Sequence, residues 1–139
     1  MKYFQFTLWF GAVLMSAIVG INSATAQTNV SDEAMRLIAS SSVSMPESQF
    51  EVSSDGAVFT VLRVNSMTNA SPHQGRNNEA NAIVKAIVAE FKQRGTQYSD
   101  INTIIVQYVE RSGKPVHDRI IDRIDFRRSA DGKFELHVT

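Results

Sequence analysis

EANAIVKAIVAEFKQR, residues 79–94, carries the clearest helical pattern in this chain. Its apolar side chains recur at the spacing of a single helical face and are Ala80, Ile83, Val84, Ile87, Val88 and Phe91. Asn77 or Asn78 is suited to cap its start, and Arg94 followed by Gly95 is typical of a helix end. Such a helix must bury its apolar face against a second layer, which the flanking segments have to supply.

Three strand-like runs follow this helix: Ile101 to Glu110, Val116 to Arg127 and Lys133 to Val138. Turn-forming residues separate them at 112–115 and 129–132. In the last two runs apolar residues alternate with charged ones. This alternation predicts an antiparallel sheet with one face buried and the other in water.

The residues before the helix predict a hairpin and a long loop. Apolar residues alternate from Phe50, Asp55-Gly56 marks a tight turn, and the second arm, 57–64, is apolar on both faces. We therefore expect this arm near the centre of the sheet. Residues 65–78 are polar and without period, which predicts an exposed loop. Earlier in the chain, Ser31 is suited to cap a short helix that ends in the serines at 40–42.

The element order is therefore helix, two strands, helix, three strands. It predicts an α+β fold in which a five-stranded antiparallel sheet carries the long helix on one face. Residues 27–139 have the length of one domain.

Residues 1–26 have the features of an export signal. Lys2 is followed by an almost unbroken apolar run from residue 6 to 21, and small residues, Ala24 and Ala26, stand where a signal peptidase reads them. We expect cleavage before Gln27 and a periplasmic or secreted product. The alternative is an uncleaved membrane anchor, although the run is shorter than the roughly 20 residues that span a bilayer.

The composition restricts the classes of function. The chain has no cysteine, which excludes thiol catalysis and thiolate metal sites. Loss of Lys2 with the signal leaves 13 basic side chains against 14 acidic ones, so nothing in the net charge attracts nucleic acid or an anionic membrane. No spacing of histidines predicts zinc, and no glycine-rich or nucleophile motif predicts a cofactor or a catalytic residue.

Two groups of residues are candidate binding sites. Arg119, Arg123 and Arg127 fall on one face of the run 116–127 and predict a basic stripe that can bind a carboxylate or phosphate. The alternative is a solvated face on which Asp125 and Glu135 neutralise the arginines. The second group is His73 with Arg76 in the loop 65–78, beside the amino end of the long helix; the alternative there is a loop without a ligand.

Asp122 falls on the face of this run opposite to the three arginines, among isoleucines that we expect to be buried. Such a carboxylate needs a partner arginine, a position at an edge or a bulge that turns it outward, or else a raised pKa that would make it a candidate acid.

These observations predict an exported, non-enzymatic domain that binds a protein or an envelope component through the sheet face, an open sheet edge or the loop 65–78. They predict no cofactor, no metal, no nucleic acid and no stable membrane insertion after cleavage, and leave the oligomeric state open. The alternative is a small ligand-binding or hydrolytic domain with a pocket between helix 79–94 and the sheet, with Asp122, His73 and Arg123 as its first candidates.

Overall fold

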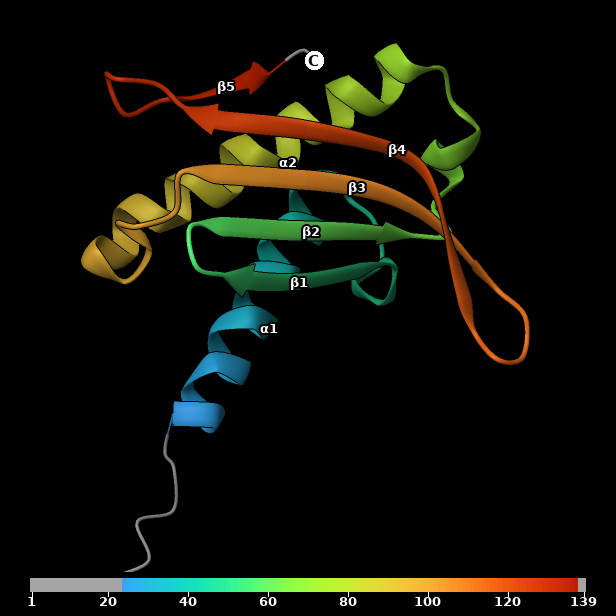
Figure 1. Ribbon diagram of the computed structural model, residues 1–139, viewed down its shortest axis with the longest axis horizontal. Coiled ribbons are helices and arrows are strands. Elements are labelled where there is room, and N and C mark those ends of the chain that lie inside the picture. Colours follow the sequence, from blue (N-terminus) through green and yellow to red (C-terminus); the bar gives the residue numbers. More distant parts are fainter. Residues whose placement is uncertain (1–23, 138–139) are drawn as a thin grey trace, which may run out of the picture.

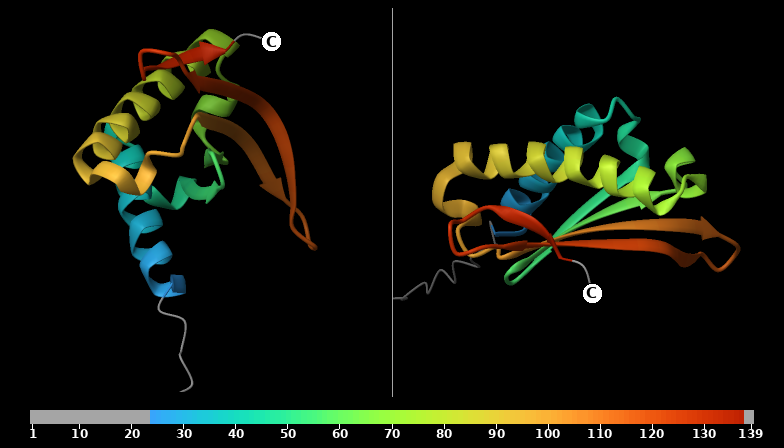
Figure 2. Two further views of the ribbon diagram at one scale, coloured as in Figure 1. Left: turned by 60° about the vertical axis from the view of Figure 1, so that its left-hand side comes forward. Right: turned by 90° about the horizontal axis from the view of Figure 1, so that it is seen from above.

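The helix α2, His73–Arg94, lies across one face of a five-stranded sheet in the computed structural model, which describes residues 24–137 (Figure 1). The strands are β1 Phe50–Asp55, β2 Val58–Val64, β3 Thr103–Ser112, β4 His117–Arg128 and β5 Phe134–His137. A second helix, α1 Ala24–Ser42, packs on the same face (Figure 2). The described part of the chain also contains three short 3-10 helices: η1 Glu47–Gln49, η2 Met67–Ala70 and η3 Gly95–Tyr98. The predicted α+β class and element order are confirmed.

The sheet is mixed, so the prediction of a purely antiparallel sheet was wrong. The strand order is β1-β2-β3-β4-β5, and β2 runs parallel to β3 while every other pair is antiparallel. The cause is α2, which returns the chain to the end of the sheet where β2 began. A connection of this length across one face gives parallel neighbours, whereas a tight turn cannot.

The predicted turns are confirmed. Gly56 has a φ of +55° in the turn between β1 and β2, a conformation that glycine adopts without steric cost. β3 ends at Ser112, the first residue of its predicted turn, and β4 ends at Arg128, directly before its predicted turn. As expected, β2 lies inside the sheet.

Both helices begin earlier than predicted. α2 starts at His73, so the segment 65–78 is not one long loop but contains η2 and the first turn of α2. Pro72 stands before this turn, and its carbonyl accepts from the amides of Gly75 and Arg76 at 2.9 and 3.3 Å. A proline at a helix start loses no backbone hydrogen bond.

α1 starts at Ala24 instead of near Ser31, and its predicted end in the serine run is confirmed. Among its side chains from residue 32 onward, Met35 and Ala39 are fully buried. Residues 24–26 of the predicted signal thus belong to α1. Residues 1–23 of that signal, and Val138 of the predicted last strand, lie outside the described residues.

The core fills the space between α2 and the middle of the sheet. Phe91 of α2 stacks on Tyr98 with ring centroids 4.4 Å apart and meets the edge of Phe59 from β2 at 5.3 Å. Ile83 and Ile87 of α2 are fully buried in the same cluster. The hydrophobic effect on these side chains holds the helix against the sheet.

A β-bulge changes the faces of β4 halfway along. Asp122 pairs with Tyr108, but Ile120 pairs with the next residue of β3, Val109, so Ile121 is an extra residue on β4. An extra residue reverses the alternation of side chains beyond it. Side chains before Ile121 therefore lie on the opposite face of the sheet from the one that regular alternation with the residues after it would predict.

Candidate functional site

His73, Arg76 and Asp122 form one ion-paired cluster. Nδ1 of His73 lies 2.7 Å from Oδ2 of Asp122, and Nε of Arg76 donates to the same oxygen at 2.6 Å. The histidine and the arginine come from the first turn of α2, whereas the carboxylate comes from β4 beside the bulge. Asp122 therefore has the partner arginine that its place among isoleucines requires.

The pKa of Asp122 is lowered from its usual 3.8. Burial by itself raises the pKa of this carboxyl, but hydrogen bonds from Arg76, from His73 and from the backbone amide of Arg123 stabilise the charged form and outweigh burial. A carboxylate that is ionised at neutral pH has no proton to donate. The alternative of a raised pKa at Asp122 was therefore wrong.

A buried arginine, which sequence reasoning missed, holds η2 in place. Arg63 of β2 is fully buried; its Nε donates to Glu79 of α2 at 2.7 Å and its Nη2 donates to the Ser66 hydroxyl at 2.7 Å. The guanidinium lies 4.0 Å from the ring centroid of Phe50, and Thr68 donates to the same glutamate at 2.6 Å. The sequence did contain a signal, because alternate residues of a strand share a face, and Arg63 alternates with the buried Val61 and Phe59.

The phenol of Tyr108 lies in the same region and donates to the carbonyl of Arg76 at 2.9 Å. Burial, followed by the negative charge of Glu79, raises its pKa far above the ordinary range. The hydroxyl thus stays protonated and serves as a fixed donor to α2. Together with the arginine network, it fixes the amino end of α2 to the sheet.

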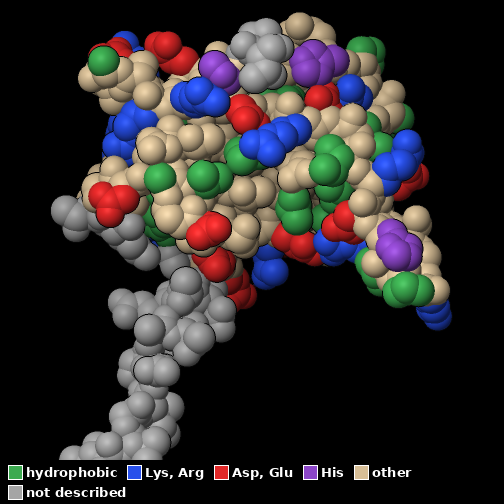
Figure 3. All heavy atoms as spheres, viewed as in Figure 1, with side chains coloured by type: hydrophobic (Ala, Val, Ile, Leu, Met, Phe, Trp, Pro, Cys, Tyr) green, Lys and Arg blue, Asp and Glu red, His purple; other side chains and the backbone are tan. Residues whose placement is uncertain are grey.

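The three arginines of the predicted stripe do not share one face. Arg123 and Arg127 lie on the open face of the sheet, which is turned away from the helices, whereas the bulge at Ile121 moves Arg119 to the other side. Arg119 pairs with Glu110, and Nε of Arg123 donates to Asp125 at 2.8 Å. Basic and acidic side chains lie next to each other on the open face (Figure 3). This arrangement resembles the solvated alternative more closely than a continuous stripe.

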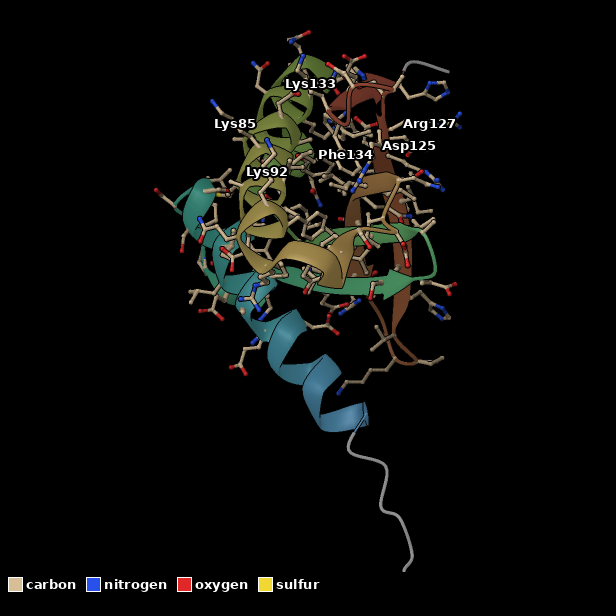
Figure 4. The ribbon with its side chains drawn as sticks, turned by 90° about the vertical axis from the view of Figure 1, so that its left-hand side faces the viewer. Lys85, Lys92, Asp125, Arg127, Lys133 and Phe134 are labelled. Atoms are coloured by element: carbon tan, nitrogen blue, oxygen red, sulfur yellow. The ribbon has the colours of Figure 1, made fainter. Side chains whose placement is uncertain are left out.

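A groove runs between α2 and the β4–β5 hairpin, and we call it the lysine groove. It consists of two adjoining depressions of about 470 and 260 Å³. Their shared lining comes from both sides: Val88, Lys92, Gly132 and Phe134. The larger depression adds Lys85 and Val84 of α2, Phe126 of β4 and Lys133 of the hairpin. In Figure 4, Phe134 lies between the helix lysines and the strand that carries Asp125 and Arg127.

The charge of the lysine groove has one sign. Three of the four lysines in the described residues line it, namely Lys85, Lys92 and Lys133, and Arg128 lines the smaller depression, with its guanidinium 5.0 Å from the Phe134 ring. Neither depression has an Asp or Glu in its lining. Lys133 pairs with Asp131 outside the lining at 2.6 Å, whereas no described residue forms an ion pair or hydrogen bond with the side-chain ammonium group of Lys85 or Lys92.

The floor of the lysine groove is apolar. Val84 and Phe126 are buried, and the half-buried side chains of Val88 and Phe134 pack against the core. A concave apolar surface with a few polar groups at its edge is the usual form of a ligand site. The lining of the groove does not include His73, Asp122 or Arg123, the first candidates for a pocket between helix 79–94 and the sheet.

A second groove, of about 600 Å³, lies between η2 and the β3–β4 hairpin. Its lining is mostly polar and includes Asn65, Ser66 and the Arg119–Glu110 pair. Its charges are thus already compensated within the chain. Of the predicted site residues, only Arg119 lies here.

Among residues 24–137, no group of three or more His, Cys, Asp or Glu side chains is placed to hold a metal ion. Within the same range, no helix combines the length and the hydropathy needed to cross a membrane. Comparison with protein-family models, with curated proteins and with solved structures finds no match to this chain.

Proposed function

We propose that this chain is an exported, non-enzymatic binding domain that holds an anionic, partly apolar ligand in the lysine groove. The observation that carries the proposal is the unpaired charge of Lys85 and Lys92 above an apolar floor, in a lining without a carboxylate. Unpaired cations attract an anion, and the floor gains free energy when an apolar group covers it.

Binding is better supported than catalysis. The carboxylate that sequence reasoning considered as an acid, Asp122, has a lowered pKa and two cationic or potentially cationic partners. The nearby Tyr108 keeps its proton and donates to a backbone carbonyl. Groups tied up in this way stabilise the fold rather than exchange protons with a substrate.

We prefer the lysine groove to the open sheet face as the binding surface. Arg123 on that face is already paired with Asp125, so an incoming anion would have to compete with an existing ion pair. Lys85 and Lys92 have no such competitor among residues 24–137. An anion therefore gains more free energy by pairing with one of these lysines than by pairing with Arg123.

The export part of the proposal rests on residues 1–26. Cleavage before Gln27 would remove three residues of α1 and leave its buried residues, Met35 and Ala39, in place. With a tag at its carboxyl end in a bacterial host, the product is expected in the periplasm with the mass of residues 27–139. A product that stays in the membrane with residues 1–26 attached would contradict export by cleavage.

The groove can be tested with 1-anilinonaphthalene-8-sulfonate, a fluorescent probe that joins an apolar ring system to a sulfonate. We expect saturable binding to the folded protein, about tenfold weaker after Lys85→Glu or Lys92→Glu. Lys114→Glu is the matched control, because it makes the same charge change in the turn between β3 and β4. If all of these proteins bind the probe equally, or none binds it, the proposed function is wrong.

A further inference from the structure

The lysine groove is bordered by a free sheet edge. β5 is the last strand of the sheet, and among residues 24–137 it pairs only with β4, on one side. In Figure 2, β5 curves over towards α2 at the same side of the molecule. An edge strand presents unpaired amide and carbonyl groups, and an extended peptide can pair with them as an added strand.

The cations are spread along the groove. Lys85 and Lys92 lie two turns apart on α2, which separates their backbone positions by about 10 Å. Lys133 and Arg128 come from the opposite side, at the β4–β5 hairpin. A ligand with a single anionic head group binds best where the cations are gathered at one point. Cations on both sides of an open groove suit an extended ligand with several anionic groups.

The apolar surface continues along β5. Phe134 and Leu136 alternate with Glu135 and therefore share the helix-facing side of the strand. Leu136 is a large hydrophobic residue with 41% of its surface exposed. A strand added to β5 would direct its own helix-facing side chains towards these two residues and towards the lysines of α2.

We infer that the occupant of the lysine groove is an extended segment of a partner protein, rich in acidic and apolar residues, that pairs with the free edge of β5. The inference rests on the proposed function and names the class of partner. Backbone hydrogen bonds to β5 align the segment, its carboxylates meet the unpaired Lys85 and Lys92, and its apolar side chains cover Phe134 and Leu136.

The test uses a short fluorescent peptide of aspartate and valine, with asparagine in place of aspartate in the control peptide. Anisotropy titrations of residues 27–139 are expected to show binding of the acidic peptide alone, at least about tenfold weaker after Lys85→Glu or Lys92→Glu. Lys114→Glu is expected to change the affinity by less than about twofold, because that exposed residue lies on the β3–β4 turn.

N-methylation of the peptide backbone tests strand pairing. Two derivatives carry methyl groups on alternate amides, so that each blocks one edge of the added strand. Because only one edge faces β5, we expect one derivative to lose binding and the other to retain it. If both derivatives bind like the parent peptide, with the lysine dependence intact, the groove binds acidic groups without strand pairing and the inference is wrong.

Vesicles of phosphatidylglycerol distinguish a lipid ligand from a peptide. If these vesicles bind in a Lys85- and Lys92-dependent manner while the acidic peptide does not bind, the inference is wrong and the proposed function stands. If neither the peptide, the vesicles nor the sulfonate probe depends on these lysines, the proposed function itself is wrong.

Discussion

Arg63 shows how a single residue can determine the position of a whole segment. Its guanidinium is fully buried, yet Glu79, Ser66 and the carbonyl of Gln49 accept its hydrogen bonds and Phe50 lies against it. A buried charge is tolerated only with such complete pairing. The network joins β2, η2 and α2.

Replacing this residue is expected to be strongly destabilising. Arg63→Met leaves the carboxylate of Glu79, which is only 10% exposed, without its cation. We expect urea denaturation to show a loss of about 3–5 kcal/mol in the free energy of unfolding. Arg119→Met is the control, since its ion pair is exposed and such pairs contribute about 0–1 kcal/mol. Equal losses in the two variants would contradict the structural role of Arg63.

Asp122 provides a prediction on pH. Its pKa in the folded state is below 3.8, so the ionised carboxylate stabilises the protein above that pH, and the contribution is lost as the pH falls through the lowered pKa. Asp122→Asn is therefore expected to be less stable than the wild type at neutral pH, with a difference that shrinks in acid. Thermal unfolding from about pH 7 to about pH 2 measures this difference. A difference that stays constant over this range would refute the assignment.

Sequence patterns identified part of the ion-paired cluster of His73, Arg76 and Asp122 but did not indicate the lysine groove. The alternation of residues placed Asp122 on the buried side, where a carboxylate needs a partner. Its pairing with Arg76 depends on the path of the chain over many intervening residues and could not be predicted. Lys85 and Lys92 are exposed residues of α2, and no sequence pattern singled them out. They form a site together with Phe134, which is distant in the sequence and lies opposite them only in the folded chain.

At the scale of elements, α2 organises the molecule. Its apolar face covers the sheet, and its passage across that face makes β2 and β3 parallel. The helix itself was readable because its apolar residues recur at helical spacing. The parallel pairing of β2 and β3 had a signal in the sequence, because β2 is apolar on both faces and a helix connects it to β3, and both features are typical of parallel neighbours.

The bulge at Ile121 could not be located from the alternation of residues along β4. Alternation in a sequence predicts faces only while the ladder is regular, and one inserted residue reverses them. Arg119 therefore left the stripe that its spacing from Arg123 predicted. By contrast, the turns were predictable, because Asp-Gly and Ser-Gly-Lys-Pro have specific backbone preferences.

Phe91 tests the packing of α2. Its ring is 5% exposed and contacts the rings of Tyr98 and Phe59. We expect Phe91→Ala to lower the free energy of unfolding by about 3–5 kcal/mol in chemical denaturation, because it removes a large side chain from a close-packed core. For comparison, Arg123→Gln removes an exposed ion pair on the open sheet face, with an expected change below about 1 kcal/mol. Comparable losses would mean that the two faces are misassigned.

For the whole molecule, net charge conceals where the charges lie. The full chain has 14 basic and 14 acidic side chains, which excludes a general attraction to polyanions. Yet three of the four lysines in residues 24–137 line one groove whose lining has no acid. A local field of this kind can select a partner although the molecule as a whole is neutral. Composition alone could not predict it.

Binding of an anionic, partly apolar partner in the lysine groove can be mapped residue by residue. An amide NMR titration of ¹⁵N-labelled residues 27–139 with the acidic peptide does this, because each backbone amide reports separately. We predict saturable shifts in residues 81–92 of α2 and 132–136 of the β4–β5 hairpin, with the amides of Arg123 and Arg127 unchanged. Shifts centred on Arg123 and Arg127, with the groove unaffected, would contradict it.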